Sequence, residues 1–481
     1  MSNIRTIIQA VDSQSEEYGV YLPNHAVNFL KIPASTLTIA FGSQETQGTV
    51  VRRTDGRATQ ITVSLLRKLR LPVGIPILLR YDSIRRRLVF GPYVGVLLAK
   101  HNGPNSSMPF AGISTFMNEI SDVCYEKGGV IGVFTPQDID WGNQTVRALV
   151  RKRASWRSYT LPLPQCIYNR LPTRQYEQKE QVGASIQRFK DLHIPFFNDQ
   201  FLNKWHVHDA LSKEEQTNAY LPKTVRLFGS HDLKQMLNDH RMVYVKPTSG
   251  SMGKGIYRIN KTTNGFQLQY ATMNGSVTRS YPDIPVLYQA LRKSIQGTHY
   301  LLQQGLVLIG VKRKPADFRV LVQKNQRGEW AVTSLVARLG QNHIVSNVAR
   351  GGMMTKADQA LRIAGPWVGS IRPSVQSLKN VALQVADTLE RVLTGHYAEF
   401  GVDLGVDVNG RIWLLEVNSK PSKSDSTIQR PEGEGEEVST YKIRPSVRRL
   451  YEYSSYLSGY VASNNPPSAK QKKVKRKRQR R

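Results

Sequence analysis

The segment EFGVDLGVDVNGRIWLLEVNSKP, residues 399–421, restricts the fold more than any other stretch of this sequence. Two runs of strand-forming residues flank Asn409–Gly410, which is the two-residue signal for a tight β-hairpin. Because side chains alternate between the faces of a strand, Glu416 and Asn418 lie on one face, and Asp403 of the partner strand can join them. Glu416 stands inside an apolar run, where an unpaired carboxylate is costly. The segment therefore predicts a hairpin whose acidic face meets a cation.

Oxygen ligands of this kind suit Mg²⁺, which binds through a few carboxylates and completes its shell with water and substrate phosphates. The hairpin thus predicts a magnesium site made by Asp403, Glu416 and Asn418. The alternative is that Asp403, Asp407 and Glu416 are surface charges on an edge hairpin.

A second candidate site is the glycine-containing loop in YVKPTSGSMGKGIYRIN, residues 244–260. A Walker A loop needs G-x-x-x-x-G-K-[ST] leading into a helix, whereas this loop leads into a strand and is predicted to be a hairpin lid. Its small residues would let backbone amides approach phosphate oxygens, and Lys246 could direct a compact charge at them. The same letters also fit a plain turn.

Three further apolar runs contain candidate residues for binding phosphate and adenine. Arg319 in ADFRVLVQ and Arg338 in SLVARLG can grip phosphate or carboxylate with their guanidinium groups. Asp317 shares a strand face with Arg319 and could accept from ribose hydroxyls, or it could form a structural pair with an arginine. The run YLLQQGL ends in Gln303–Gly305, whose backbone suits an adenine edge.

A length of 481 residues predicts two or three domains. Short apolar runs broken by Gly, Pro and Asp predict a β-rich domain over residues 1–92. Alternating strand and helix patterns predict a parallel α/β domain over 93–200. A third domain is predicted over 201–425, followed by a tail over 426–481 that is basic and disordered from about residue 462. The sequence shows no internal repeat.

One long helix is marked in the third domain. Apolar residues recur at helical spacing from Val375 to Val392, and Ser374 is placed to cap the helix and Gly395 to end it. Its apolar stripe predicts a contact with the core rather than with a cofactor.

The formal net charge of +31 is unevenly distributed, since the last twelve residues contain nine Lys or Arg and no acid. Such a field attracts polyanions without specifying which one. The alternative for the tail is a solvated, disordered end.

Cys124 and Cys166 are the only cysteines, so neither a disulfide framework nor a cysteine metal cluster is predicted. No run of eighteen apolar residues and no apolar signal segment occurs. We expect a cytoplasmic protein without a membrane span.

These segments, in order, resemble the ATP-grasp superfamily, and the ending G-x-D…E-V-N-x-x-P is similar to that of RimK-type and tubulin tyrosine ligase-type enzymes. The segments GPYVGVLLA, PLPQCIYNRLPTR, FFNDQFLNKW, YLPKTVRL and WLLEVNSKP together resemble the YheC/YheD family, described as associated with the endospore coat. The likeness covers roughly residues 1–425.

The resemblance implies a multidomain fold of α/β and α+β type, with a small N-terminal β domain, a pre-ATP-grasp α/β domain and an ATP-grasp fold of two α+β subdomains. ATP would lie between these subdomains. Asp403, Glu416 and Asn418 match the magnesium positions, for two ions. The implied nucleotide contacts are Lys204, Lys246, Ser249, Gly250, Ser251, Gly253, Gln303, Gln304, Leu306, Asp317 and Arg338.

The resemblance also implies a ligase that phosphorylates a carboxylate and lets an amine or related nucleophile displace the phosphate, with Arg319 and Arg338 offsetting charge. His206, His208 and His396 are interpreted as structural, because this chemistry needs no histidine and HVH lacks a third metal ligand. The competing hypothesis is a spore-coat binding or structural protein that keeps the scaffold without turnover.

The partner is expected to be an unknown carboxylate-bearing acceptor, acidic in character because the chain is basic, and the tail could contact a polyanion. Association with the endospore coat is expected from the resemblance. Ser422–Lys423 stands where many ligases carry a glycine, which leaves the entry of substrate at that point open.

Overall fold

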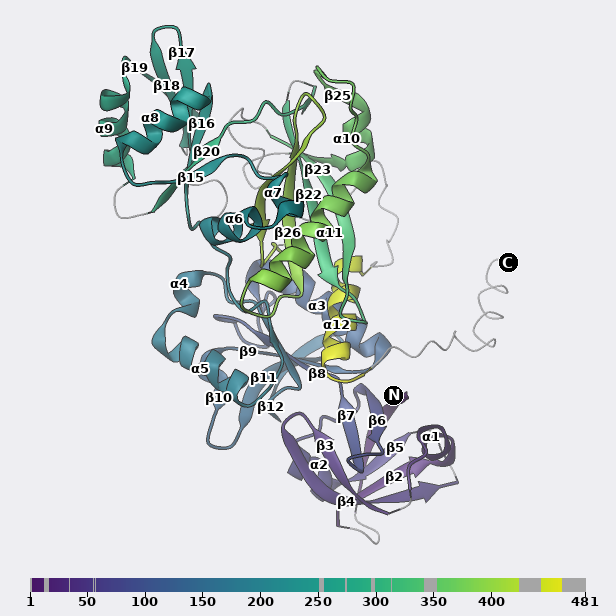
Figure 1. The fold of residues 1–481 in the computed structure, drawn as a ribbon. Helices are drawn as coiled ribbons and strands as arrows, with labels where there is room; N and C mark the ends of the chain where they lie inside the picture. The colour runs from purple at the N-terminus through teal and green to yellow at the C-terminus, as the bar shows by residue number, and fades with distance from the viewer. Residues whose placement is uncertain are drawn as a thin grey trace. The chain divides into compact units, whose positions relative to one another are not determined.

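The computed structural model describes residues 2–12, 17–33, 35–54, 56, 58–250, 255–272, 275–295, 299–312, 314–340, 353–423 and 443–460. The chain divides into two compact units (Figure 1). Unit 1 comprises residues 1–196, 325–328 and 438–481, and unit 2 comprises residues 197–324 and 329–437. The predicted class, a multidomain fold of α/β and α+β type, is confirmed.

The N-terminal part of unit 1 is a closed barrel with the strand order β1-β5-β2-β4-β3-β7-β6. Its interior is filled by branched aliphatic side chains, as the short β-branched runs predict. The elements are β1 (Asn3–Val11), β2 (Gly19–Pro23), α1 (Asn24–Leu30), β3 (Thr36–Phe41), β4 (Gln44–Arg53), β5 (Thr59–Thr62), α2 (Val63–Leu69), β6 (Pro76–Asp82) and β7 (Arg87–Gly91).

The barrel contains a structural repeat that the sequence alone did not reveal. Helices α1 and α2 each follow a strand directly, and each ends at a basic residue in the left-handed conformation, Lys31 at φ 54° and Arg70 at φ 53°. Each of these residues is followed by an apolar residue and a proline, in Leu30–Pro33 and Leu69–Pro72. Four aligned positions are too few for a repeat to be recognised from residue identity.

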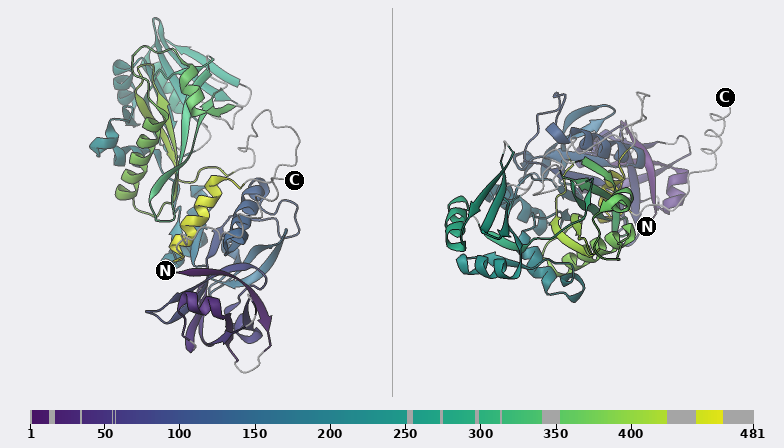
Figure 2. Two further views of the ribbon diagram at one scale, coloured as in Figure 1. Left: turned by 90° about the vertical axis from the view of Figure 1, so that its right-hand side faces the viewer. Right: turned by 90° about the horizontal axis from the view of Figure 1, so that it is seen from above.

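The second part of unit 1 is a mixed sheet with the core order β10-β11-β9-β8-β13, in which β8, β9 and β13 are parallel. Helix α3 makes the crossover from β8 to β9, and α12 packs beside α3 (Figure 2). The elements are β8 (Tyr93–Leu97), α3 (Ser114–Lys127), β9 (Val130–Phe134), β10 (Ile139–Asp140), β11 (Thr145–Lys152), β12 (Ser155–Pro162), β13 (Cys166–Asn169), α4 (Arg174–Glu177), α5 (Glu180–Asp191) and α12 (Pro445–Leu457).

Helix α3 begins at Ser114, six residues after Met108, the first apolar residue of its segment. Ala111 has a φ of +48°, and the Ser114 hydroxyl accepts a hydrogen bond from the N–H of Phe110 and donates one to the carbonyl of Ala111. These contacts accompany a short 3₁₀ helix at Ala111–Ile113, and α3 begins directly after it.

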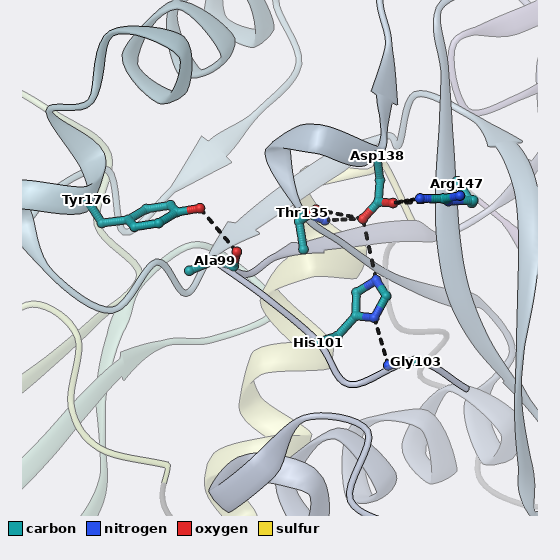
Figure 3. Close-up of polar contacts among 7 residues, drawn as sticks. All are labelled: Ala99, His101, Gly103, Thr135, Asp138, Arg147 and Tyr176. Carbon is teal, nitrogen blue, oxygen red and sulfur yellow. Dashed lines mark hydrogen bonds and ion pairs between the residues drawn. The ribbon is translucent and has the colours of Figure 1, made fainter. Parts of the chain in front are cut away.

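A polar cluster joins the carboxyl ends of β8 and β9 (Figure 3). The buried carboxylate of Asp138 accepts hydrogen bonds from the backbone and hydroxyl of Thr135, at 3.0 and 2.7 Å, and from Nε and Nη2 of Arg147, at 3.1 and 2.9 Å. His101 Nε2 lies 3.5 Å from the same carboxylate, and Nδ1 accepts from the N–H of Gly103. Burial raises the pKa of Asp138, but these donors outweigh it and hold that pKa below its usual value. The cluster therefore fastens the loop after β8 to the end of β9.

The first half of unit 2 is an antiparallel sheet in the order β15-β20-β16-β17-β18-β19. Helices α8 and α9 contact each other and the sheet, and their leucines form its core with Val243, Val245 and Ile259. The elements are β15 (Thr224–Leu227), α8 (Ser230–Asp239), β16 (Met242–Pro247), β17 (Tyr257–Thr262), β18 (Gly265–Thr272), β19 (Gly275–Tyr281), α9 (Ile284–Ser294) and β20 (Tyr300–Gln304).

The second half of unit 2 is built on the long strand β22, which pairs with β23 on one side and β26 on the other. Helix α11 packs on β22, β23 and β26. The elements are α6 (Lys204–Ser212), α7 (Glu215–Asn218), β21 (Gly310–Val311), β22 (Lys314–Lys324), β23 (Trp330–Leu339), β24 (Met353–Lys356), α10 (Ala357–Ile363), β25 (Ala364–Gly365), α11 (Val375–Val392), β26 (Glu399–Val406) and β27 (Ile412–Asn418). The two-residue strand β14 (Phe196–Phe197) falls where the two units divide.

The predicted long helix is confirmed as α11. The Ser374 hydroxyl accepts from the N–H of Ser377, and the predicted apolar stripe is buried against the sheet. The helix ends at Val392, before the predicted stop at Gly395, and the N–H of Leu393 still donates to the carbonyl of Leu389.

Candidate functional site

The predicted hairpin is formed by β26 and β27, and its register brings the predicted metal ligands together. Asp403 lies opposite Glu416, and Asn418 lies opposite Gly401, with a bulge after Asp403. Strand β26 is internal, because it pairs with both β22 and β27, and Asp403 is only 5% exposed. The reading of Asp403 as a surface charge on an edge strand is therefore wrong.

Asp407 has a separate, structural role in the turn of this hairpin. Its Oδ1 accepts from the backbone N–H groups of Asn409 and Arg411, at 2.9 and 3.0 Å, and its Oδ2 accepts from Trp413 Nε1 at 2.9 Å. Both oxygens are used inside the turn, so Asp407 does not belong with the predicted ligands.

Asp403 is held by two arginines from neighbouring strands. Arg319 on β22 contacts both carboxylate oxygens, with Nη2 at 2.8 Å from Oδ2, and Arg338 Nη2 on β23 lies 3.0 Å from the same Oδ2. Arg338 also donates two hydrogen bonds to Asp317, at 2.6 and 2.8 Å. Burial raises the pKa of Asp403, but the two guanidinium groups outweigh burial and hold that pKa below its ordinary value. Asp317 thus makes the structural pair that was left open from the sequence.

Two lysines lie near Glu416, on the second strand of the hairpin. Lys204, the first residue of α6, lies 3.3 Å from Glu416 Oε1 and donates to the carbonyl of Gly250 at 2.9 Å. Lys246 on β16 donates to Gln303 Oε1 at 2.5 Å. Burial lowers the pKa of Lys246 to about 8, with Glu416 opposing this change and Lys204 adding to it.

The donor set fits magnesium chemically, because two carboxylates and one amide oxygen on adjacent strands are the ligands that Mg²⁺ takes when phosphates supply the rest. Among the described residues, no group of three His, Cys, Asp or Glu side chains is placed to hold a metal ion. Each carboxylate of the set is instead paired with a cation, Asp403 with two arginines and Glu416 with Lys204. A metal ion would have to replace these cations.

A pocket that is partly open to solvent lies between the two halves of unit 2. One wall is formed by α6 and β27, and the other by the approach to β15 together with β16 and β20. The lining residues are Lys204, Val207, His208, Leu221, Pro222, Thr224, Lys246, Leu301, Gln303, Leu414, Leu415, Glu416 and Val417. The sequence did not predict that His208 and the apolar residues line this pocket, because only the tertiary structure brings them to it.

The predicted adenine segment divides between two roles. Gln303 lines the pocket and donates to the hydroxyl of Thr224 at 3.1 Å. Gln304 is joined through both its backbone and its side chain to the backbone of Lys223. Leu306 follows the end of β20 and does not line the pocket.

The predicted lid connects β16 and β17, which pair as an antiparallel hairpin with Met242 opposite Asn260. At its start, the hydroxyl of Ser249 lies 3.5 Å from Asn203 Nδ2, and Gly250 is held by Lys204. Ser251 and Gly253 lie outside the described residues.

Lys423 is a buried counter-ion. Its Nζ lies 2.7 Å from Glu399 Oε2, and both side chains are at most 5% exposed. Asn198 and Gln323 also donate to Glu399, at 3.0 and 3.1 Å. Lys423 therefore fastens the segment after Asn418 to the start of β26.

Comparison with known proteins agrees with this fold. A family model described as YheC/D like ATP-grasp matches residues 193–457, which places the chain in the ATP-grasp class. Within that class the chain belongs to the YheC/D-like family. It is 30% identical over 371 residues to the endospore coat-associated protein YheD of Bacillus subtilis (strain 168), covering 76% of this chain and 79% of YheD. It is 24% identical over 307 residues to YheC of the same organism, covering 62% of this chain and 82% of YheC.

Among solved structures, the D-alanine-D-alanine ligase from Coxiella burnetii overlaps with a TM-score of 0.45 and 13% identity, covering 81% of this chain and 98% of the ligase. A likeness of this size says nothing of the activity. Within the described residues, no helix is both long and apolar enough to cross a membrane.

Proposed function

We propose that this protein binds Mg·ATP in the pocket of unit 2 and acts as a ligase that joins a carboxylate to an amine or related nucleophile through an acyl phosphate. The observation that carries the proposal is the convergence of four cationic side chains on one acidic hairpin. Lys204, Lys246, Arg319 and Arg338 come from four separate elements and lie around the face of Asp403 and Glu416. A structural scaffold has no need of this arrangement.

The ion pairs of the site can exchange partners when a polyphosphate enters. Phosphate oxygens offer the arginines and Lys204 new anionic partners, which frees the carboxylates of Asp403 and Glu416 for magnesium. When bound, magnesium would neutralise phosphate charge and polarise the transferred group. Asp403, Glu416 and Asn418 are the residues that would hold it.

Catalysis would then rest on positioning and electrostatics. The ammonium of Lys246 and the guanidinium of Arg319 would offset the charge that develops on the transferred phosphoryl group, in a site where part of the water is excluded. Placing the acceptor carboxylate in line with the terminal phosphate would supply much of the remaining acceleration. No histidine or serine nucleophile is required.

The acceptor and its place in the cell belong to the same proposal. A net charge of +31 favours an acidic acceptor, and the names of the two relatives favour a protein that associates with the endospore coat. The basic terminal residues 470–481 would contact a polyanion. If about four of their cations bind phosphates, log affinity falls with log salt with a slope of about −4.

The first test is calorimetric titration of the full chain with a non-hydrolysable Mg·ATP analogue. We expect Lys246→Ala and Glu416→Gln each to weaken binding by about tenfold, because each removes one charged contact. Lys234→Ala, an exposed lysine on α8 in the same half of unit 2, is the matched control and should bind like the wild type. A wild-type protein that binds no nucleotide would overturn the proposal.

A second measurement separates the ligase from a coat protein that keeps only the scaffold. ADP formation is followed with acidic peptides and amines as acceptors. Nucleotide binding without ADP formation under any combination would favour the second candidate, a binding or structural protein of the coat.

A further inference from the structure

One face of α6 runs along the whole pocket. Lys204, Val207 and His208 are spaced three and four residues apart, so they lie on the same side of the helix, and all three line the pocket. His208 is four residues from Lys204, which places it about 6 Å further along the helix axis. The pocket therefore has two distinguishable ends.

The end at Lys204 is the polyphosphate end. Lys204 contacts both the lid at Gly250 and the hairpin at Glu416, and Lys246 lines the same pocket. Most of the other lining residues are apolar, Val207, Leu301 and Leu414 among them, and Thr224 and Gln303 are polar. A nucleotide whose phosphates meet the lysines would place its flat base against these apolar side chains, toward His208.

His208 is a polar side chain that lies beside these apolar residues. Its imidazole is half-buried and lies 5.8 Å from the ring of Trp205, and neither nitrogen hydrogen-bonds to any residue that the structure describes. Burial lowers the pKa of His208, an effect that Asp209 opposes and Lys223 adds to, so the ring is neutral at pH 7. A neutral imidazole offers one donor and one acceptor, and a half-buried polar group of this kind is stabilised when it finds a partner.

We propose that His208 hydrogen-bonds the edge of the nucleotide base and is the side chain by which this pocket distinguishes a nucleotide from a bare polyphosphate. The inference rests on the proposed function, since it takes Mg·ATP as the ligand. It also reverses the sequence-based interpretation of His208 as structural.

The neighbouring His206 provides an internal control. It is on the same helix, two residues earlier, and its side chain is exposed outside the pocket. Only its backbone N–H takes part in the cap, by donating to Asn203 Oδ1. Replacing His206 therefore changes the composition of α6 as much as replacing His208 does, without altering the wall of the pocket.

The test compares two ligands of the full chain. A non-hydrolysable Mg·ATP analogue is titrated by calorimetry, and Mg·tripolyphosphate, which has no base, is measured at up to millimolar concentration by displacement of a fluorescent adenine nucleotide. We expect His208→Ala to weaken binding of the nucleotide by about fivefold, as the loss of one net hydrogen bond does. The affinity for tripolyphosphate should stay within about twofold of the wild-type value. His206→Ala should change neither ligand, and Lys204→Met should weaken both.

His208→Asn, which keeps a donor and an acceptor, should restore most of the nucleotide affinity, and the melting temperature of each variant shows whether it folds. The proposal is overturned if His208→Ala leaves nucleotide binding unchanged or weakens both ligands by the same factor. If the wild type binds tripolyphosphate but gains nothing from the base, His208 has no such role although the phosphate site stands. If the wild type binds neither ligand, the proposed function fails and this inference fails with it.

Discussion

The pKa of Lys246 predicts that nucleotide binding depends on pH in a range where most lysines do not titrate. Burial lowers this pKa from 10.5 to about 8. About nine tenths of the molecules then carry the charge at pH 7, and about one tenth at pH 9. Because only the ammonium form attracts phosphate, the dissociation constant for an Mg·ATP analogue should rise by about tenfold between pH 7 and pH 9.

The same shift predicts that nucleotide binding takes up a proton. Near pH 8 about half of the free protein is uncharged at Lys246, and a bound polyphosphate would raise the pKa of this lysine, so about half a proton should enter per nucleotide. Calorimetric titrations at pH 7, 8 and 9, each in two buffers of different ionisation enthalpy, measure both the affinity and the proton uptake.

Lys246→Met is the control, because it keeps the length of the side chain and removes the titrating group. Any pH dependence that belongs to the ligand remains in this variant and can be subtracted. Should the wild type and Lys246→Met show the same pH dependence and the same proton uptake while both bind, the argument from the burial of Lys246 is wrong.

The lowered pKa also sets the sign of a stability effect. Between about pH 8 and pH 10.5 the unfolded chain binds more protons at Lys246 than the folded chain does, so the free energy of unfolding contributed by this lysine rises with pH in that window. At pH 7, below this window, the charged Lys246 makes its full destabilising contribution to the folded state. Lys246→Met should therefore raise the melting temperature at pH 7, and its advantage should shrink above pH 8.

Three further predictions concern other ion pairs of the molecule. Lys423→Met should lower the free energy of unfolding by about 3 kcal/mol, because it leaves the carboxylate of Glu399 buried without its cation. In the double variant with Glu399→Gln, the loss measured by chemical denaturation should be smaller than the sum of the two single losses. Asp138→Asn should lower the free energy of unfolding by about 2 kcal/mol at pH 7. This difference in stability from the wild type should vanish as the pH falls through the lowered pKa of Asp138, because protonation then removes the same charge from the wild type. Arg319→Met should weaken Mg·nucleotide binding by about tenfold and yet strengthen binding of Mn²⁺ alone, followed by electron paramagnetic resonance, since it frees one side of Asp403; weaker binding of both would contradict the exchange of partners.

Much of the site could be anticipated from local patterns. The pairing of Asp403 with Glu416 follows from strand alternation and the Asn409–Gly410 turn, and the hairpin at 244–260 follows from two apolar runs around a loop of small residues. The start of α11 followed from the Ser374 cap. These features depend on neighbours within a few residues, so the local sequence is enough to predict them. The domain boundaries and the roles of the individual site residues remain predictions.

Other assignments depended on which strands lie side by side. Asp403 meets Arg319 because β26 pairs with β22, across 84 residues of sequence. The role of Asp407 likewise became clear only from the structure, in which both of its carboxylate oxygens accept hydrogen bonds within its own turn.

By itself, the sequence determined that this chain forms short strands and amphipathic helices in several domains, that one hairpin carries two carboxylates and an amide on a shared face, and that Lys246 precedes a loop of small residues. Local spacing sets these properties, because the periods of strand and helix decide which side chains share a face. The tertiary structure alone decided that Lys423 is buried against Glu399 and that His208, rather than His206, faces the pocket. Burial and charge pairing at these positions arise from segments distant in sequence, and no local pattern encodes such a contact.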